Sequence, residues 1–281
     1  IMDRCVFHDA FNEIAAMDEC RKAPGVCEML DYGVDDSCYW IVMRYYEKSL
    51  HKWRTEVLEE GIASGAIDAC EAVDRIFDCF RQICHGVQSL HHRGIVHYDL
   101  KMHNIIVNEL PDNKIQTALA DFGESRIMDD LATDRYCVER GRGTECIKSP
   151  EMLKMHLQIK RDRDGFDRRK NIGTSCPSDI WSLGCLFYEI LTGSWLFTDD
   201  KFWKLYGSAD GSVVDEDQKE ILCRLLHARA DRLADKSPHT SQKLISKPED
   251  VYHFLCWMLL RHLKTWTNFN RCCPIVDKVQ P

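Results

Sequence analysis

The chain has 281 residues, of which 44% are hydrophobic and 29% charged, a composition typical of a globular protein with a sizeable core. No apolar run reaches the roughly 18 residues that a membrane span needs, and residues 1–20 carry charges throughout, unlike a secretory signal. The net charge of -8 argues against non-specific nucleic-acid binding. The 15 cysteines include no C-x-x-C pair, so they indicate free thiols in a reducing cytoplasm rather than a zinc site.

The first predicted elements are a helix and two strands. Residues 9–22 predict a helix, which the breaker sequence at 23–25 ends. Residues 26–32 and 38–45 predict two strands. The segment 33–36, Gly-Val-Asp-Asp, is expected to form the turn between them.

Helices dominate the sequence that follows. Between residues 73 and 90, apolar side chains recur every three or four positions and predict one long amphipathic helix that ends at Gly94. Two short strands are expected at 105–107 and 115–120. A second helix, at 179–191, has apolar residues around most of its circumference and should be buried on nearly every side.

Two polar stretches are predicted to be surface insertions. Residues 158–177 are rich in Lys, Arg, Asp and Gly, and residues 207–249 surround one amphipathic segment. The basic part of the first, at 160–170, favours a solvated loop, and the alternative is a docking site for an acidic protein partner.

The segment 97–104, His-Tyr-Asp-Leu-Lys-Met-His-Asn, carries the main chemical signal. Asp99 and Asn104 are five residues apart, which suits two coupled needs of phosphoryl transfer: a carboxylate that orients a substrate hydroxyl and an amide oxygen that helps hold a divalent metal. Lys101 can neutralise charge on the transferred phosphate. These residues are therefore candidate catalytic groups.

A second signal lies 22 residues after Asp99, at Asp121-Phe122-Gly123. A carboxylate at the end of a strand can bind the Mg²⁺ that bridges nucleotide phosphates, and the glycine lets the chain turn sharply. Asp121 and Asn104 are thus the predicted metal ligands.

The two motifs, in this order, resemble the catalytic loop and the metal-binding motif of eukaryotic-type protein kinases. The resemblance extends to residues 143–151, similar to the end of an activation segment, and to 178–184, similar to the start of the central helix of the large lobe. It implies an α+β bilobal fold, with 1–46 as a partial small lobe and 47–281 as a helical large lobe. It also implies that Asp179 braces the backbone of the catalytic loop.

By the same resemblance, ATP and Mg²⁺ are the expected cofactors. Glu13 corresponds to the helix glutamate that pairs with the ATP-anchoring lysine of kinases. Met43 corresponds to the gatekeeper residue, and the backbone of Arg44, Tyr45 and Tyr46 to the adenine-binding hinge. Glu151 is expected to pair with an arginine near the C-terminus, for which Arg271 is the best candidate.

Two departures from the family pattern shape the expectations. The chain shows neither a Gly-rich phosphate loop nor the anchoring lysine, which counting back from Glu13 places upstream of Ile1. Tyr98 stands where most kinases have an arginine that pairs with an activation-loop phosphate. Because tyrosine cannot form a charge-assisted pair, we expect activity to depend less than usual on phosphorylation of residues such as Thr133.

Lys101 and the Gly143-Thr144 pair favour a serine/threonine kinase, with a protein hydroxyl as substrate, and Thr144 is expected to contact Asp99 and Lys101. Three alternatives remain. A pseudokinase or scaffolding module on the same fold is opposed by the presence of Glu13 and the catalytic residues. A small-molecule phosphotransferase is opposed by the docking segment. A nucleic-acid-binding module has only the basic loop in its favour.

Overall fold

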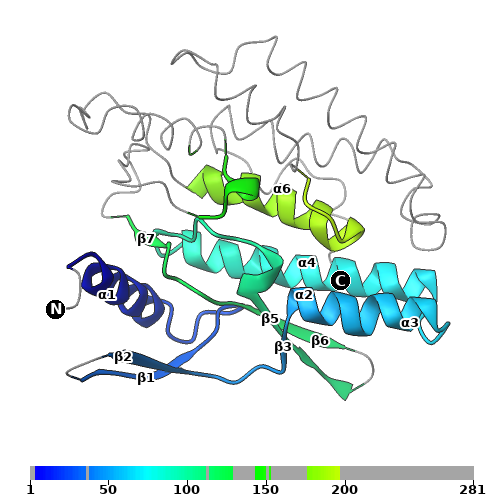
Figure 1. The fold of residues 1–281 in the computed structure, drawn as a ribbon, viewed down its shortest axis with the longest axis horizontal. Coiled ribbons are helices and arrows are strands. Elements are labelled where there is room, and N and C mark those ends of the chain that lie inside the picture. The colour runs from blue at the N-terminus through cyan, green and yellow to red at the C-terminus, as the bar shows by residue number, and fades with distance from the viewer. Residues whose placement is uncertain are drawn as a thin grey trace, which may run out of the picture.

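The computed structural model describes residues 4–35, 38–111, 114–128, 143–149, 152 and 176–196. Helix α1 (Arg4–Glu19) precedes the strands β1 (Met29–Val34) and β2 (Tyr39–Met43), which pair as an antiparallel hairpin (Figure 1). The structure thus contains the predicted helix and two strands with shifted bounds. Helix α1 covers 4–19 rather than 9–22, because turn hydrogen bonds and the positive φ of Lys22 end the helix early.

The hairpin also differs in its details from the prediction. Strand β1 continues through Gly33 and Val34, which the sequence placed in the turn. Trp40 lies directly across from Gly33 and covers it, so an aromatic ring packs where the glycine has no side chain. Tyr45 falls outside β2, on the segment that leads to the next strand.

That segment leads into a small three-stranded sheet and a helical run. Strand β3 (Lys48–Ser49) pairs with β5 (Ile105–Glu109), and β5 pairs with β6 (Ile115–Leu119), all antiparallel. Between β3 and β5, one helical run comprises α2 (Leu50–Trp53), the π-helical turn η1 (Arg54–Glu59) and α3 (Glu60–Ala63). Ser49 caps α2 by accepting a hydrogen bond from the Lys52 N–H.

Helix α4 (Ala69–His91) confirms the predicted long amphipathic helix. Asp68 accepts a hydrogen bond from the Glu71 N–H at 2.9 Å and caps its first turn. Gly94 follows its end with a φ of 70°. The buried face carries side chains at three- and four-residue steps, namely Ala72, Ile76, Cys79, Phe80, Ile83, Val87 and Leu90.

Helix α6 (Cys176–Thr192) begins three residues before the predicted start, so Cys176 and Pro177 belong to this helix rather than to a loop. Every residue from 178 to 190 is buried, as its all-round apolar pattern predicted. Figure 1 shows α6 beside α4, and the Phe187 ring contacts the Phe80 ring with centroids 4.5 Å apart. These two helices form the centre of the main hydrophobic core.

The remaining short elements lie around this core. They are β4 (Ile95–Val96), which pairs with β7 (Arg126–Ile127), and the 3-10 turns η2 (Met102–Asn104) and η4 (Glu145–Ile147). Within the described residues, no helix has the length and apolarity to cross a membrane. The predicted insertion at 207–249, most of the one at 158–177, and residues Thr133, Glu151 and Arg271 lie outside the described residues.

Candidate active site

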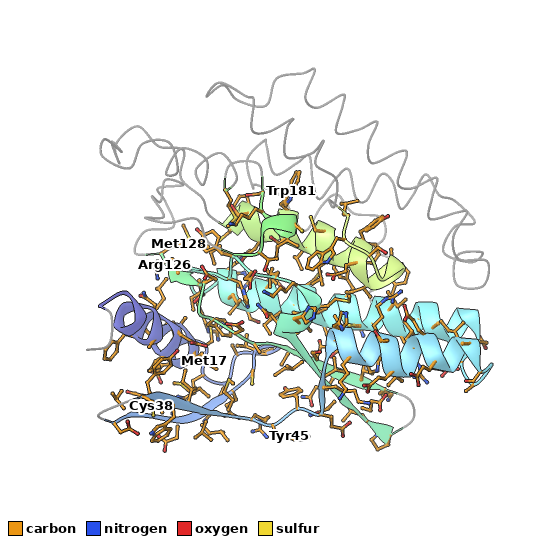
Figure 2. The ribbon with its side chains drawn as sticks, in the orientation of Figure 1. Met17, Cys38, Tyr45, Arg126, Met128 and Trp181 are labelled. Atoms are coloured by element: carbon orange, nitrogen blue, oxygen red, sulfur yellow. The ribbon has the colours of Figure 1, made fainter. Side chains whose placement is uncertain are left out.

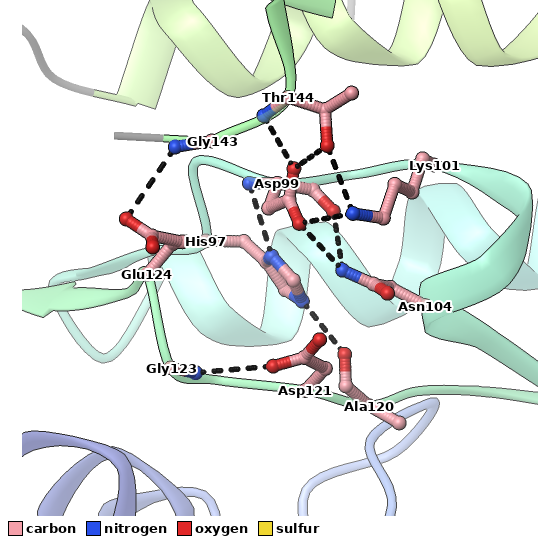
Figure 3. Close-up of polar contacts among 10 residues, drawn as sticks. All are labelled: His97, Asp99, Lys101, Asn104, Ala120, Asp121, Gly123, Glu124, Gly143 and Thr144. Atoms are coloured by element: carbon pink, nitrogen blue, oxygen red, sulfur yellow. Dashed lines mark hydrogen bonds and ion pairs between the residues drawn. The ribbon is translucent and has the colours of Figure 1, made fainter. Parts of the chain in front are cut away.

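Four of the predicted catalytic residues meet at one carboxylate (Figure 3). The Oδ2 atom of Asp99 accepts hydrogen bonds from Lys101 Nζ at 2.7 Å and from Asn104 Nδ2 at 2.9 Å. Its Oδ1 atom accepts from both the backbone N–H and the hydroxyl of Thr144, each at 2.7 Å. Lys101 Nζ also donates to Thr144 Oγ1 at 2.8 Å. The expected contact of Thr144 with Asp99 and Lys101 is therefore present.

These contacts set the charge of Asp99. The side chain is largely buried, which alone would raise its pKa, but hydrogen bonds from Lys101 and Thr144 outweigh burial and lower the pKa below its usual value. Asp99 therefore remains ionised at neutral pH. Such a carboxylate is suited to accept and orient a hydroxyl group rather than to hold a proton permanently.

Helix α6 fixes the backbone of this loop. The fully buried carboxylate of Asp179 accepts hydrogen bonds from the N–H groups of His97 and Tyr98, both at 2.8 Å. His91 Nε2 lies 2.9 Å from the same carboxylate. This is the bracing contact that the sequence predicted for Asp179. It holds Tyr98 at a φ of 65°, a conformation that non-glycine residues rarely adopt.

His97 connects the loop to the second motif. Its Nδ1 atom accepts the Asp99 N–H at 3.3 Å, so its Nε2 atom carries the proton and donates to the Ala120 carbonyl at 3.1 Å. The His97 ring also packs against the buried Phe122 ring, with centroids 5.1 Å apart. The backbone at Asp99 and the backbone at Ala120 are thus joined through one imidazole, a role that the sequence analysis did not assign.

The segment carrying Thr144 closes over the loop. Gly143 has a φ of 71°, and a methyl group at this position would collide with the carbonyl oxygen of Tyr98. Only glycine at position 143 therefore allows Thr144 to approach Asp99 so closely. Further along the same segment, the hydroxyl of Ser182 on α6 donates to the Ile147 carbonyl at 3.0 Å and holds η4 against α6.

Glu13 and Asp121 form a second cluster. Burial raises the pKa of Glu13, the nearby charge of Asp121 raises it further, and a hydrogen bond from the Phe122 backbone partly opposes both effects. Asp121 has a φ of 63°, and within the described residues its side chain receives one long hydrogen bond, 3.4 Å, from the Gly123 N–H. Two carboxylates held close together favour a cation between or beside them.

The donor set fits a magnesium ion. Asn104 uses its Nδ2 atom on Asp99, with bonds to the carboxylate and to the Asp99 carbonyl, which leaves its Oδ1 atom for a metal. Asp121 supplies an exposed carboxylate with little competing hydrogen bonding. Oxygen ligands of this kind are those that Mg²⁺ prefers.

The predicted hinge residues do not touch either cluster through any hydrogen bond among the described residues. Met43 is 42% exposed and Tyr45 is 79% exposed. Tyr45 lies on the segment between β2 and β3 (Figure 2). The Arg44 N–H donates to the Glu28 carbonyl at 2.9 Å, and the Arg44 carbonyl accepts from Cys27 Sγ at 3.6 Å. Both backbone groups of Arg44 are therefore already engaged.

Tyr46 connects the predicted hinge to the segment that carries Asp121. It packs against a small cluster that contains Cys27, Ala118 and Ala120, and Ile106 packs on the same cluster. Ala120 immediately precedes Asp121, so this apolar surface adjoins the second motif. The sequence analysis missed Ile106 and Ala120, although their alternation along two predicted strands was a usable signal.

Helix α6 contributes one further group that no motif indicated. The buried side chain of Glu189 accepts a hydrogen bond from the Met102 backbone, and its Oε2 atom has no hydrogen-bond partner within the described part of the chain. Burial raises its pKa to about 7, against the opposing effects of the Met102 N–H and of Arg54 and Lys101. A titratable carboxyl group therefore supports the loop at residues 97–104.

Comparison with known proteins places this site in a family. The protein kinase domain family model matches residues 3–271. A probable serine/threonine-protein kinase of Dictyostelium discoideum is 39% identical over 220 residues, which are 73% of this chain but 9% of that relative. The probable serine/threonine-protein kinase FMP48 of Saccharomyces cerevisiae is 26% identical over 270 residues, 92% of this chain and 70% of that relative.

The chain therefore belongs to the protein kinase domain family, and the resemblance inferred from the motifs is confirmed. Its mixture of helices and strands is the α+β bilobal fold of that family. A third relative, CBL-interacting protein kinase 25 of Oryza sativa, is 29% identical over 195 residues, 69% of this chain and 33% of that protein. The chain thus spans only part of these relatives.

Proposed function

We propose that this chain is the catalytic region of a serine/threonine protein kinase, which transfers the γ-phosphate of ATP to a hydroxyl group of a protein substrate. The observation that carries the proposal is the cluster in which Lys101, Asn104 and Thr144 all contact the Asp99 carboxylate. Each group in it has a use in phosphoryl transfer. Residues 1–46 would supply part of the small lobe and 47–281 the large lobe.

Asp99 accepts and orients the substrate hydroxyl, because its lowered pKa keeps it ionised. Lys101, whose ammonium group already lies 2.7 Å from Asp99, offsets negative charge on the phosphoryl group as it moves. Thr144 bonds both side chains, so the segment that meets the substrate is coupled to the catalytic carboxylate. The hydroxyl acceptor and the phosphate would thus converge at one point.

Asn104 and Asp121 would hold Mg²⁺, which when bound would neutralise negative charge on the phosphates of the nucleotide. The adenine ring would lie against the apolar surface formed by Tyr46, Ile106 and Ala120, beside the strand that carries Met43. Within the described residues, the backbone N–H groups of Tyr45 and Tyr46 make no hydrogen bond and are available to adenine. Glu13 would orient the lysine that anchors the phosphates.

Lys101 and Thr144 favour serine and threonine as acceptors over tyrosine, in line with the printed names of two of the relatives, those of Dictyostelium discoideum and Saccharomyces cerevisiae. A pseudokinase is the alternative, and the complete set of contacts around Asp99 disfavours it, because a binding module has no need of an ionised, fully bonded carboxylate at this place. We further propose a reducing, cytoplasmic location, which suits the free cysteines of the described residues, and an acidic protein partner for the basic stretch 160–170.

The test is phosphate transfer from labelled ATP to a peptide library containing Ser, Thr and Tyr, with the full-length protein and Mg²⁺. We expect label on Ser or Thr, none on Tyr, and loss of transfer after Asp121→Asn. Asp74→Asn, on the exposed face of α4, is the matched control and should retain turnover. Label on Tyr alone would refute the substrate class, and ATP binding without any transfer would establish the pseudokinase.

A further inference from the structure

Two glycines from distant parts of the chain bring two backbones into direct contact. Gly25 lies on the segment between α1 and β1 and has a φ of 73°, while Gly86 is buried in the interior of α4. A methyl group on Gly25 would lie 2.7 Å from the Gly86 Cα atom, and one on Gly86 would lie 2.6 Å from the Gly25 carbonyl oxygen. At these distances no side chain fits at either position without moving a backbone.

The glycine in α4 is costly for the helix that contains it. Glycine in a helix interior is less favourable than alanine, because it loses more backbone freedom when the chain folds. Gly86 is the one glycine of α4, and it falls at the point where the other backbone comes nearest. The need for close packing therefore explains why this position lacks a side chain.

The close approach lets residues 25–27 pair with β6 as a short parallel strand. The Leu119 N–H donates to the Gly25 carbonyl at 2.9 Å, and the Leu119 carbonyl accepts from the Cys27 N–H at 2.8 Å. Without this segment, the backbone groups of Leu119 that point away from β5 would have no partner in the sheet. The 25–27 segment thus completes one edge of the sheet that leads to Asp121.

Helix α4 completes the rest of the same edge with a side chain. The Oε1 atom of Gln82 accepts the Thr117 N–H, and its Nε2 atom donates to the Ile115 carbonyl, both at 2.9 Å. Gln82 and Gly86 are four residues apart and therefore lie on one face of the helix. This face offers an amide group where β6 has no neighbouring strand and leaves space where the 25–27 segment takes that place.

The 25–27 segment also carries Cys27 to the surface proposed for adenine. Cys27 is buried in one apolar cluster with Ala118 and Ala120, and Tyr46 and Ile106 pack against that cluster. Because the Cys27 N–H is bonded to β6, the place of its side chain in the cluster depends on how closely the segment approaches α4. The contact between the two glycines is therefore connected to the shape of this surface.

We propose that Gly25 and Gly86 are positioning residues of the nucleotide site, because their contact seats Cys27 in the apolar surface that receives adenine. The proposal rests on the proposed kinase function and adds to it two residues that act only through their neighbours. A side chain at either position would move the 25–27 segment away from β6 and weaken its bonds to Leu119. We expect weaker nucleotide binding with little change in the chemical step, since Asp99 and Lys101 lie on another segment.

The first test is the nucleotide affinity of the full-length protein, measured by titration with a fluorescent ATP analogue and Mg²⁺ below the temperature of thermal unfolding. Gly86→Ala should weaken binding about tenfold, an effect of the size that one methyl group inserted into a packed region can cause, although alanine is the better helix former. Gln88→Ala, at an exposed position of α4, is the matched control and should keep the wild-type affinity. Wild-type affinity in Gly86→Ala would overturn the proposal.

The second test separates crowding from backbone strain. Gly65 has a φ of 75°, close to the 73° of Gly25, but a methyl group on Gly65 would meet nothing within 4 Å. Gly65→Ala therefore introduces the strain of a positive φ without the contact and should bind nucleotide as the wild-type protein does. Gly25→Ala should lose at least about tenfold in affinity. Equal affinities for these two variants would show that the contact has no role in binding.

Two further readouts distinguish this proposal from the kinase function. In hydrogen–deuterium exchange, the Cys27 amide of folded Gly86→Ala should exchange about tenfold faster than in the wild-type protein, whether or not phosphate is transferred; unchanged exchange would refute the positioning role. In the transfer assay, Gly86→Ala should raise the KM for ATP and keep kcat within about twofold, whereas a lower kcat with an unchanged KM would indicate a general structural defect and contradict the proposal.

The two hypotheses can therefore fail separately. If the wild-type protein binds ATP without transferring phosphate, and Gly86→Ala still weakens that binding, the kinase function fails and the positioning role stands. If phosphate transfer is robust and both the affinity and the KM for ATP are unchanged in Gly86→Ala, the positioning role fails alone.

Discussion

Glu189 offers a direct test of how α6 supports the catalytic loop. Its side chain is 3% exposed, accepts the Met102 N–H and has an Oε2 atom without a hydrogen-bond partner in the described part of the chain. A buried carboxylate that is only half satisfied disfavours its charged form. Burial accordingly raises the pKa from 4.5 to about 7, and substitution by glutamine removes this titration without a large change in shape.

The sign of the effect follows from proton linkage. Because the pKa of Glu189 is higher in the folded protein than in the unfolded chain, the folded protein binds this proton more tightly. The stability that it contributes is fully present below about pH 4.5 and is lost as pH rises through about 7. At 1.36 kcal/mol for each unit of pKa, the loss is about 3 kcal/mol.

Urea unfolding of the wild-type protein and Glu189→Gln at several pH values between 5 and 8 measures this difference. Other titrating groups are common to both proteins, so the gap between their free energies of unfolding should change by about 3 kcal/mol across the range, in favour of the variant at high pH. The exposed Glu60→Gln is the surface control and should shift the free energy of unfolding by less than about 0.5 kcal/mol. Parallel curves for the wild-type protein and Glu189→Gln would refute the reasoning.

Four further outcomes are expected. Asp179→Asn should lower the free energy of unfolding by about 3 kcal/mol in urea titrations, because an amide nitrogen cannot accept the buried N–H groups of the loop; a change below 1 kcal/mol would show that the brace is dispensable. Gly143→Ala should abolish most phosphate transfer, since its methyl group meets the Tyr98 carbonyl; unchanged kcat/KM would contradict that crowding. Tyr98→Arg should destabilise the fold by about 3 kcal/mol in thermal unfolding, because Tyr98 packs with Val96, Met128 and Met152 and a guanidinium group in its place would be buried. Thr133→Ala should change kcat/KM by less than an order of magnitude.

Much of the site could be predicted because its residues are close together in sequence. Asp99, Lys101 and Asn104 lie within six residues of sequence. This short spacing lets the side chains of Lys101 and Asn104 both reach the Asp99 carboxylate. Helices α4 and α6 could be predicted from hydrophobic periodicity, since burial on one side or on all sides leaves a direct pattern. The contact of Thr144 with Asp99 spans 45 residues and came from the family resemblance, not from periodicity.

The features that were missed depend on tertiary contacts without a local pattern. The stack of His51 on His103 joins two exposed residues from separate elements. Glu189 is a buried carboxyl group among the buried residues of α6, and its effect on the loop depends on the hydrogen bond from the Met102 N–H, which no local sequence pattern indicates. Element bounds shifted for local reasons: a bulge between Met29 and Asp31 and the pairing of Gly33 with Trp40 extend the hairpin beyond the predicted turn.

The central claim, that Asp99 serves the transfer of phosphate to a protein hydroxyl, is tested most directly by Asp99→Asn. This variant keeps the volume of the side chain but removes the charge that accepts the substrate proton and pairs with Lys101. Single-turnover transfer of labelled phosphate from ATP to a serine peptide, with contaminating kinases excluded, should fall by at least about two orders of magnitude while ATP affinity and the thermal unfolding profile remain close to wild type. Turnover at the wild-type rate in a folded Asp99→Asn protein would contradict the assignment.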